Sequence, residues 1–283
     1  MSDSPLTFLY RGSLTSCNYA CDYCPFGKTA FDSESLNADR IEVQRFVELI
    51  ECCNGRDLSL MFIPWGEALM HEHYQQAIVR LSHVQAMQTV AAQTNLSPPP
   101  DWLEDAEPQK TALWCTFHPT QTTLDAFLGH LDILNTLSIR YSVGMVGRDD
   151  LFEAGLQLRK KLTSHITFWV NPLDDDIDAY TPERIKQWSQ LDPLFPLTAK
   201  HRQTRNTKCR CGDSVFTVSG NGDLRRCPFT KEVIGNIYNG SNILPTIARP
   251  CPNDQCNCFI GYIHWETDTF RTLYCKPPIL RIT

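Results

Sequence analysis

The stretch Cys17-Asn18-Tyr19-Ala20-Cys21-Asp22-Tyr23-Cys24 carries three cysteines at a C-x3-C-x2-C spacing, shortly after an apolar run at residues 6–14. Three thiolates this close together can bind one face of an iron-sulfur cube, whose four irons need four ligands. One iron then keeps an open coordination position. A metal centre with an open position is reactive, as in catalytic zinc sites that bind water or substrate there. The stretch therefore predicts a reactive iron-sulfur centre, with a structural zinc site as the alternative.

The cysteine spacing, with aromatic Tyr23 directly before Cys24, resembles the signature of radical S-adenosylmethionine (radical SAM) enzymes. The resemblance implies a [4Fe-4S] cluster held by Cys17, Cys21 and Cys24. Its open iron would chelate the amino and carboxylate groups of SAM, and Tyr23 would lie near the adenine. It also implies reductive cleavage of SAM to a deoxyadenosyl radical that abstracts hydrogen from a substrate. Thirteen cysteines in 283 residues make a chance match the alternative, so the motif needs support from its context.

Composition excludes several other classes of protein. With 42% hydrophobic and 20% charged residues, the chain can bury a core like an ordinary globular protein. No apolar run approaches the roughly 18 residues that a membrane span requires, and the N-terminus lacks a basic signal-peptide region. We therefore expect a cytoplasmic protein without membrane association, in which cysteines are metal ligands rather than disulfides. The net charge of −6 argues against nucleic-acid binding, which usually leaves a basic surface.

Strand-like and helix-like segments alternate along the first two thirds of the chain. Strands are expected at residues 6–14, 58–63, 89–93, 111–117, 139–146 and 166–170. Helices are expected at residues 69–83, 123–136 and 149–162. Two more helices are expected to begin at an N-cap, one at Asn37 or Asp39 and one at Thr181. Because parallel strands need helix-length crossovers, this alternation predicts an α/β fold with a parallel sheet. Six repeats resemble the partial (β/α)6 TIM-like barrel of radical SAM domains, which implies a site at the C-terminal strand ends.

A change in composition divides the chain. Pro193 and Pro196 cannot both lie inside a continuing helix, and seven of the thirteen cysteines follow residue 208. We therefore predict a radical SAM domain at residues 1–190, a linker at 191–204 and a small Cys-rich C-terminal domain at 205–283.

Polar residues after the expected strands supply candidate cofactor contacts. Pro64-Trp65-Gly66-Glu67 resembles the Gly-Gly-Glu motif of radical SAM enzymes, with Trp65 in place of the first glycine. The resemblance implies that Gly66 and Glu67 bind the SAM ammonium; an exposed turn is the alternative. Thr94-Asn95 resembles a family pair at the end of the third strand, so Asn95 either contacts the cofactor or the substrate, or caps the strand end. His118 also follows a strand, where it either meets the substrate or makes a structural hydrogen bond.

The tail has its own cysteine pattern. Cys211, Gly222 and Cys227 read C-x10-G-x4-C around a predicted hairpin. The tail resembles the SPASM and twitch extensions of radical SAM proteins, which implies one or two auxiliary [4Fe-4S] clusters, held by Cys211, Cys227 and two later cysteines. The remaining candidate ligands are Cys209, Cys251, Cys256, Cys258 and Cys275. A zinc ribbon is the alternative, since paired cysteines from two hairpins also bind zinc.

Together these patterns predict a radical SAM enzyme. By analogy with relatives its substrate is expected to be a peptide or protein side chain, and its electron donor a flavodoxin- or ferredoxin-like protein. Two alternatives remain: oxidation or rearrangement of a small metabolite by the same chemistry, and a non-enzymatic interaction protein whose cysteines bind zinc.

Overall fold

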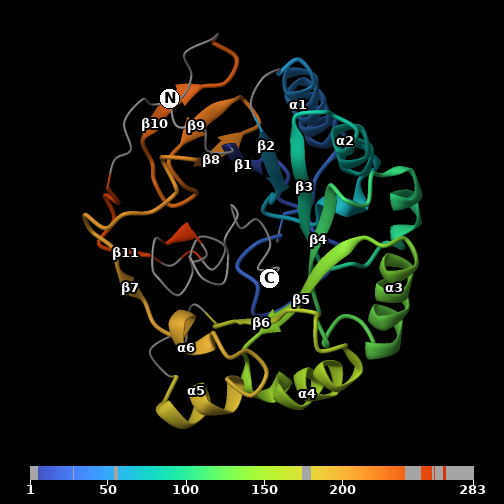
Figure 1. Ribbon diagram of the computed structural model, residues 1–283, viewed down its shortest axis with the longest axis vertical. Coiled ribbons are helices and arrows are strands. Elements are labelled where there is room, and N and C mark those ends of the chain that lie inside the picture. The colour runs from blue at the N-terminus through green and yellow to red at the C-terminus, as the bar shows by residue number, and fades with distance from the viewer. Residues whose placement is uncertain are drawn as a thin grey trace.

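A nine-stranded sheet organises the chain in a computed structural model, which describes residues 6–27, 29–53, 57–173, 180–239, 250–256, 258 and 264–265. The strand order is β10-β9-β8-β1-β2-β3-β4-β5-β6. Helices lie along the outer side of the curved sheet (Figure 1). None of the helices in these ranges has the length and apolarity needed to cross a membrane.

Six parallel strands alternate with helices, as the sequence predicts. The strands are β1 (Leu6–Arg11), β2 (Leu58–Phe62), β3 (Met87–Thr94), β4 (Thr111–Thr116), β5 (Arg140–Val146) and β6 (Phe168–Asn171). The helices are α1 (Ser33–Glu51), α2 (Glu72–Ser82), α3 (Leu124–Thr136), α4 (Phe152–Lys161), α5 (Pro182–Trp188) and α6 (Phe195–Thr198), with short 3-10 helices η1 (Ala68–Met70), η2 (Pro100–Asp105) and η3 (Asp149–Leu151). Neighbouring strands from β1 to β6 pair in parallel in chain order. Their C-terminal ends therefore share one edge of the sheet.

Burial on both faces explains why these strands are mostly apolar. Every residue of β2 is buried, as expected for a parallel strand covered on two sides. On the outer face, Tyr10 and Phe62 pack with Phe46 of α1. On the inner face, Trp114 and Trp169 meet edge to face at 4.6 Å between ring centroids.

Helix α1 begins earlier than expected. Asp32 is its N-cap, and the Asp32 carboxylate accepts a hydrogen bond from the Ser35 amide at 2.8 Å. The predicted cap at Asn37 or Asp39 is wrong because both residues lie inside the helix. Asp39 is fully buried and accepts a hydrogen bond from the Leu14 amide at 3.0 Å.

The tail continues the same sheet. Its strands are β7 (Arg202–Gln203), β8 (Val215–Ser219), β9 (Asp223–Arg225), β10 (Val233–Asn236) and β11 (Gln255–Cys256). The predicted hairpin is confirmed, since β8 and β9 pair antiparallel and Gly222 adopts a φ of 87° at the turn, a conformation that favours glycine. Strand β8 also pairs in parallel with β1, with Leu9 opposite Thr217. Strands from before and after the predicted linker at 191–204 thus belong to one sheet. The division into two domains stays a prediction.

Candidate functional site

The loop of Cys17, Cys21 and Cys24 lies at the C-terminal edge of the sheet, between β1 and α1. It belongs to the same edge as the loops that follow β2, β3, β4 and β5. Each of these loops contributes polar contacts to the cysteine loop, which is therefore fixed by residues distant in sequence.

The loop after β3 holds the first part of the cysteine loop. Asn95 Nδ2 donates to Asn18 Oδ1 at 3.0 Å and lies 3.8 Å from Cys17 Sγ. Asn18 Nδ2 donates in turn to Ser97 Oγ at 2.9 Å. The structure thus places Asn95 beside the first predicted ligand, Cys17.

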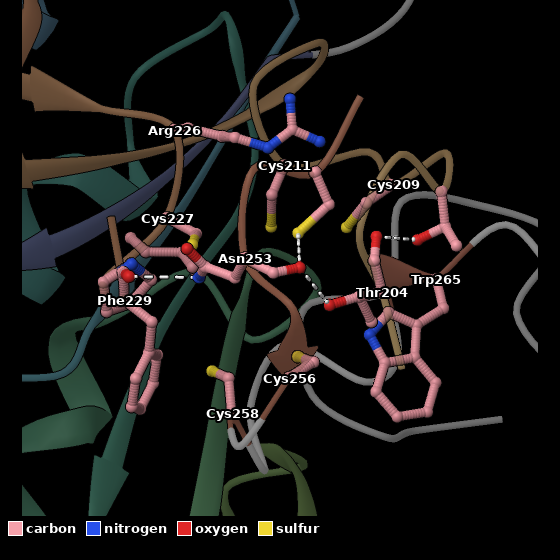
Figure 2. A pocket seen from close by; sticks show the side chains of 14 residues that line it. Thr204, Cys209, Cys211, Arg226, Cys227, Phe229, Asn253, Cys256, Cys258 and Trp265 are labelled. Carbon is pink, nitrogen blue, oxygen red and sulfur yellow. Dashed lines mark hydrogen bonds between the residues drawn. The ribbon is translucent and has the colours of Figure 1, made fainter. Parts of the chain in front are cut away.

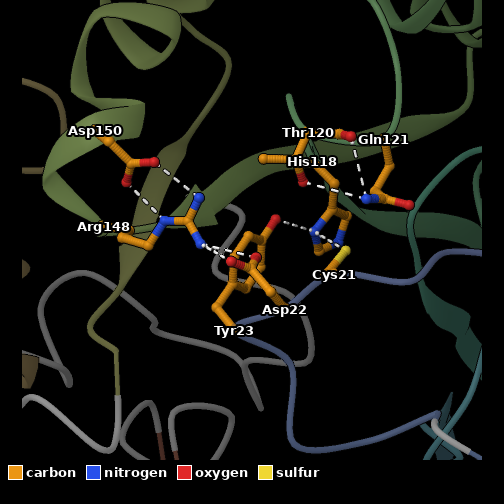
Figure 3. A network of polar contacts seen from close by, with 8 residues as sticks. All are labelled: Cys21, Asp22, Tyr23, His118, Thr120, Gln121, Arg148 and Asp150. Atoms are coloured by element: carbon orange, nitrogen blue, oxygen red, sulfur yellow. Dashed lines mark hydrogen bonds and ion pairs between the residues drawn. The ribbon is translucent and has the colours of Figure 1, made fainter.

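The loop after β4 holds the second part (Figure 3). His118 Nδ1 lies 2.8 Å from the Tyr23 hydroxyl and 3.5 Å from Cys21 Sγ. Burial lowers the pKa of His118 to about 4, so the ring is neutral at pH 7 and has one N–H donor and one acceptor nitrogen. Gln121 Oε1 accepts a hydrogen bond from the Ala20 amide at 2.9 Å. His118 thus contacts the loop rather than standing alone at a strand end.

Arg148, after β5, completes this set of contacts. It pairs with both Asp22 oxygens at 2.8 Å and with Asp150 at 2.6 Å. Its guanidinium carbon lies 4.9 Å from the centroid of the Tyr23 ring, within the range of a cation–π contact. Sequence reasoning missed Arg148 and Gln121, although a polar residue directly after an expected parallel strand is a usable signal.

The three sulfurs lie in an environment that suits metal-bound thiolates. The amides of Tyr19 and Phe26 donate to the sulfurs of Cys17 and Cys24, each at 3.4 Å. For Cys21, the nearby His118 Nδ1 donates in the tautomer that carries its proton there. N–H groups aimed at cysteine sulfurs stabilise iron-sulfur clusters and tune their potentials. The residues present therefore fit the cluster that the sequence predicts.

Gly66 lets the loop after β2 approach the cysteine loop. A side chain at Gly66 would overlap the backbone carbonyl of Ser16. The neighbouring amides donate across the same contact, from Glu67 to Ser16 at 2.9 Å and from Trp65 to Leu14 at 3.1 Å. Glycine is thus required by backbone packing beneath the cysteines.

Glu67 is buried and links the loops after β2 and β3. Its carboxylate accepts from the Thr94 hydroxyl at 2.8 Å, the Asn95 amide at 2.6 Å and the Leu69 amide at 3.0 Å. Desolvation nevertheless raises the pKa of Glu67 to about 7. These three hydrogen bonds occupy three of the roughly four acceptor positions of the Glu67 carboxylate. Room remains for one further donor, and the predicted contact with the SAM ammonium stays a prediction.

The burial of Glu67 predicts a pH-dependent stability. Because its folded pKa of about 7 lies above the ordinary 4.5, the folded protein binds more protons than the unfolded chain between these values. Stability should therefore fall as pH rises from 4.5 to 7, by on the order of 3 kcal/mol. Urea unfolding at pH 5 and 8 should show this decline in the wild type and in a control, Glu48→Gln, but not in Glu67→Gln. An equal decline in Glu67→Gln would contradict the assignment.

The tail cysteines gather around one cavity (Figure 2). Those lining it are Cys209, Cys211, Cys227, Cys251, Cys256 and Cys258. Cys211 comes just before β8, Cys227 follows β9 and Cys256 lies in β11, so the hairpin brings together cysteines far apart in sequence. Burial raises the pKa of the Cys227 thiol to about 11. Six of the seven predicted tail ligands thus share a cavity, and Cys275 lies outside the described residues.

Solved structures include chains of similar fold. Tagged anSMEcpe with bound AdoMet (SAM) has a TM-score of 0.53 at 15% identity, over 83% of this chain and 76% of that one. Native anSMEcpe with bound AdoMet and the Cp18Cys peptide has a TM-score of 0.52 at 15% identity, over 83% and 78%. BtrN, at a TM-score of 0.41 and 13% identity over 85% and 78%, is too dissimilar to support an argument. No protein-family profile and no curated sequence match the chain. The chain shares its overall fold with anSMEcpe, a radical SAM enzyme, and the α/β class with a mostly parallel sheet is as predicted.

Proposed function

We propose that this protein is a radical SAM enzyme whose catalytic [4Fe-4S] cluster is held by Cys17, Cys21 and Cys24. The observation that carries the proposal is the cysteine loop, in which backbone amides donate to the sulfurs of Cys17 and Cys24 and His118 Nδ1 lies 3.5 Å from Cys21 Sγ. Polar contacts from the ends of β3, β4 and β5 hold this loop in place. The shared fold with anSMEcpe supports it. With SAM bound, such a cluster supplies reductive cleavage of SAM and hydrogen abstraction from a substrate.

The surrounding residues position the cofactor in this proposal. The sheet forms the partial (β/α)6 barrel expected of the family, with the site at its C-terminal edge. Glu67 and the backbone at Gly66 bind the SAM ammonium, and Asn95 orients the loop of Cys17. The Tyr23 ring, held through its hydroxyl by His118, packs near the adenine.

We further propose an auxiliary [4Fe-4S] cluster in the tail cavity. Four sulfurs that bind one zinc at about 2.3 Å lie within roughly 4 Å of one another. In the described part of the chain, no group of three histidines, cysteines or acids is close enough to hold a single ion. Six cysteines nevertheless line the cavity. Six cysteines exceed the four that one zinc ion needs, and the fold shared with anSMEcpe supports iron over a zinc ribbon.

The proposed substrate is a peptide or protein side chain. One structure of similar fold, native anSMEcpe, was solved with a bound Cp18Cys peptide, and that likeness supports the class of substrate by analogy alone. A flavodoxin- or ferredoxin-like protein is proposed as the electron donor, because reductive cleavage of SAM needs a low-potential electron.

The decisive test compares the wild type with a variant in which Cys17, Cys21 and Cys24 are all serine. Anaerobically prepared wild type should bind about eight irons, or about twelve with two auxiliary clusters, and should cleave SAM when reduced. The variant should lose about four irons and all SAM cleavage while retaining the iron of the tail. Iron and sulfide counts, with electron paramagnetic resonance before and after SAM, provide the readouts.

Two outcomes would contradict the proposal. SAM cleavage that survives in the triple variant would remove the catalytic role of these cysteines. Zinc without iron in the wild type, and no response to SAM, would favour a zinc-binding interaction protein.

A further inference from the structure

A second pocket, of about 580 Å³, lies beside the cysteine loop at the C-terminal ends of β1, β8 and β9. This volume is in the range of small-ligand sites. Arg11, Arg225 and Lys231 line it together with four serine and threonine side chains. Among the described residues that line it there is no aspartate or glutamate. The pocket is therefore positively charged and rich in hydroxyl groups.

Arg11 is a buried cation in this pocket. It is the last residue of β1, on the same face as Leu9, which packs in the inner cluster. Its Nε is buried and has no hydrogen-bond partner within the described ranges, and no carboxylate of those ranges pairs with it. Burial lowers the pKa of Arg11 to about 10, which leaves it charged at pH 7. The charge of Cys258 acts on Arg11 in the opposite direction, but a thiol is a weaker counter-ion than a carboxylate, and a buried charge without a full partner is costly to desolvate.

The other two cations are also poorly compensated. The nearest carboxylate to Arg225 is that of Asp223, at 3.8 Å, near the limit for an ion pair. Lys231 is exposed and forms no ion pair with any residue that the structure describes. An arginine fork with a flexible lysine suits the oxygens of a carboxylate or phosphate.

Trp65 connects this pocket with the cysteine loop. The Arg11 guanidinium carbon lies 3.7 Å from the centroid of the Trp65 ring. The same ring contacts Phe26, two residues after Cys24, at 4.5 Å between centroids. Trp65 occupies the position where a small residue was expected from the family motif, and here it forms a wall shared by the pocket and the cysteine loop.

We propose that this pocket binds an oxyanionic group of the substrate, a carboxylate or a phosphate, through Arg11, Arg225 and Lys231. The inference rests on the proposed function for the statement that the bound anion is a substrate. An anion held beside Trp65 would place the rest of its molecule next to the cysteine loop. The substrate class is accordingly an acidic one.

The test is calorimetric titration of anaerobic holoprotein with three probes: inorganic phosphate, succinate and an acetylated Glu-Glu-Glu peptide. Saturating SAM is present throughout, so that the carboxylate of SAM occupies its own site. At least one probe should bind, and Arg11→Gln should weaken its binding at least tenfold. Lys231→Gln, a change at an exposed position, should weaken binding severalfold without affecting folding. The preferred probe identifies the source of the anion as a phosphorylated compound, a small acid or an acidic peptide.

Arg45→Gln is the matched control, because Arg45 stacks on Tyr238 at 3.6 Å and does not line the pocket. It should bind the probe like the wild type. Failure of all three probes to bind, displacement of the probe by SAM, or unchanged binding in both Arg11→Gln and Lys231→Gln would overturn the inference.

Uncoupled SAM cleavage by the wild type separates this inference from the proposed function. SAM cleavage without anion binding would contradict the proposed anion site and leave the radical SAM assignment intact. Anion binding that depends on Arg11, in a protein that never cleaves SAM, would keep the anion site and overturn its role in a radical reaction.

Discussion

Gly66→Ala is expected to abolish iron binding at Cys17, Cys21 and Cys24. The added methyl group would overlap the carbonyl of Ser16, and the clash is with backbone rather than with a side chain that can rotate away. The cysteine loop must then move off the loop after β2, which breaks the Glu67-to-Ser16 hydrogen bond. Iron counts after anaerobic reconstitution should fall by about four, to the content of the triple cysteine variant.

The chain offers a matched control in Gly129. Apart from its chain neighbours and the backbone of its own helix, no atom lies within 4 Å of the position that a methyl group would take there, and the residue is inside α3. Gly129→Ala should keep the full iron content and increase stability by about 0.5–1 kcal/mol, because alanine favours helix. Full iron content in Gly66→Ala would show that the contact with Ser16 does not position the cysteines.

Asp39→Ala is expected to cause the largest loss of stability outside the apolar core. The Asp39 carboxylate is fully buried and accepts hydrogen bonds from the Leu14 amide, the Ser13 hydroxyl and the Tyr74 hydroxyl at 3.0 to 3.2 Å. His73 Nε2 lies 2.9 Å from its second oxygen. Each buried donor left without an acceptor costs about 1–3 kcal/mol. Urea unfolding should therefore show a loss of roughly 3 kcal/mol or more.

Two further variants test the reason for that loss. Asp39→Asn keeps one acceptor oxygen and should lose less stability than Asp39→Ala. Glu48→Ala, on the exposed side of the same helix, removes only a surface hydrogen bond with Gln44 and should stay within about 0.5 kcal/mol of the wild type. If Asp39→Ala were as stable as the wild type, Asp39 would not anchor residues 13 and 14 before the cysteine loop.

Features that depend on neighbours along the chain can be predicted from the sequence alone. The spacing of Cys17, Cys21 and Cys24 and the alternation of strands with helices were readable because helix and strand periods are local. The hairpin around Gly222 was readable for the same reason, since a turn of this kind selects glycine within a few residues. The α/β class and the position of the cysteine loop at a strand end followed from these local signals.

The residues that surround the cysteines become apparent only in the folded structure. Contacts from Asn95, His118 and Arg148 reach the loop across 77 to 126 residues of chain, and the pairing of β8 with β1 depends on how the tail returns to the sheet. Such contacts are set by strand order and register, which no local pattern specifies. The same is true of Asp39, whose position inside α1 no local pattern predicts, and of Arg11, which pairs with no carboxylate among the residues that the structure describes.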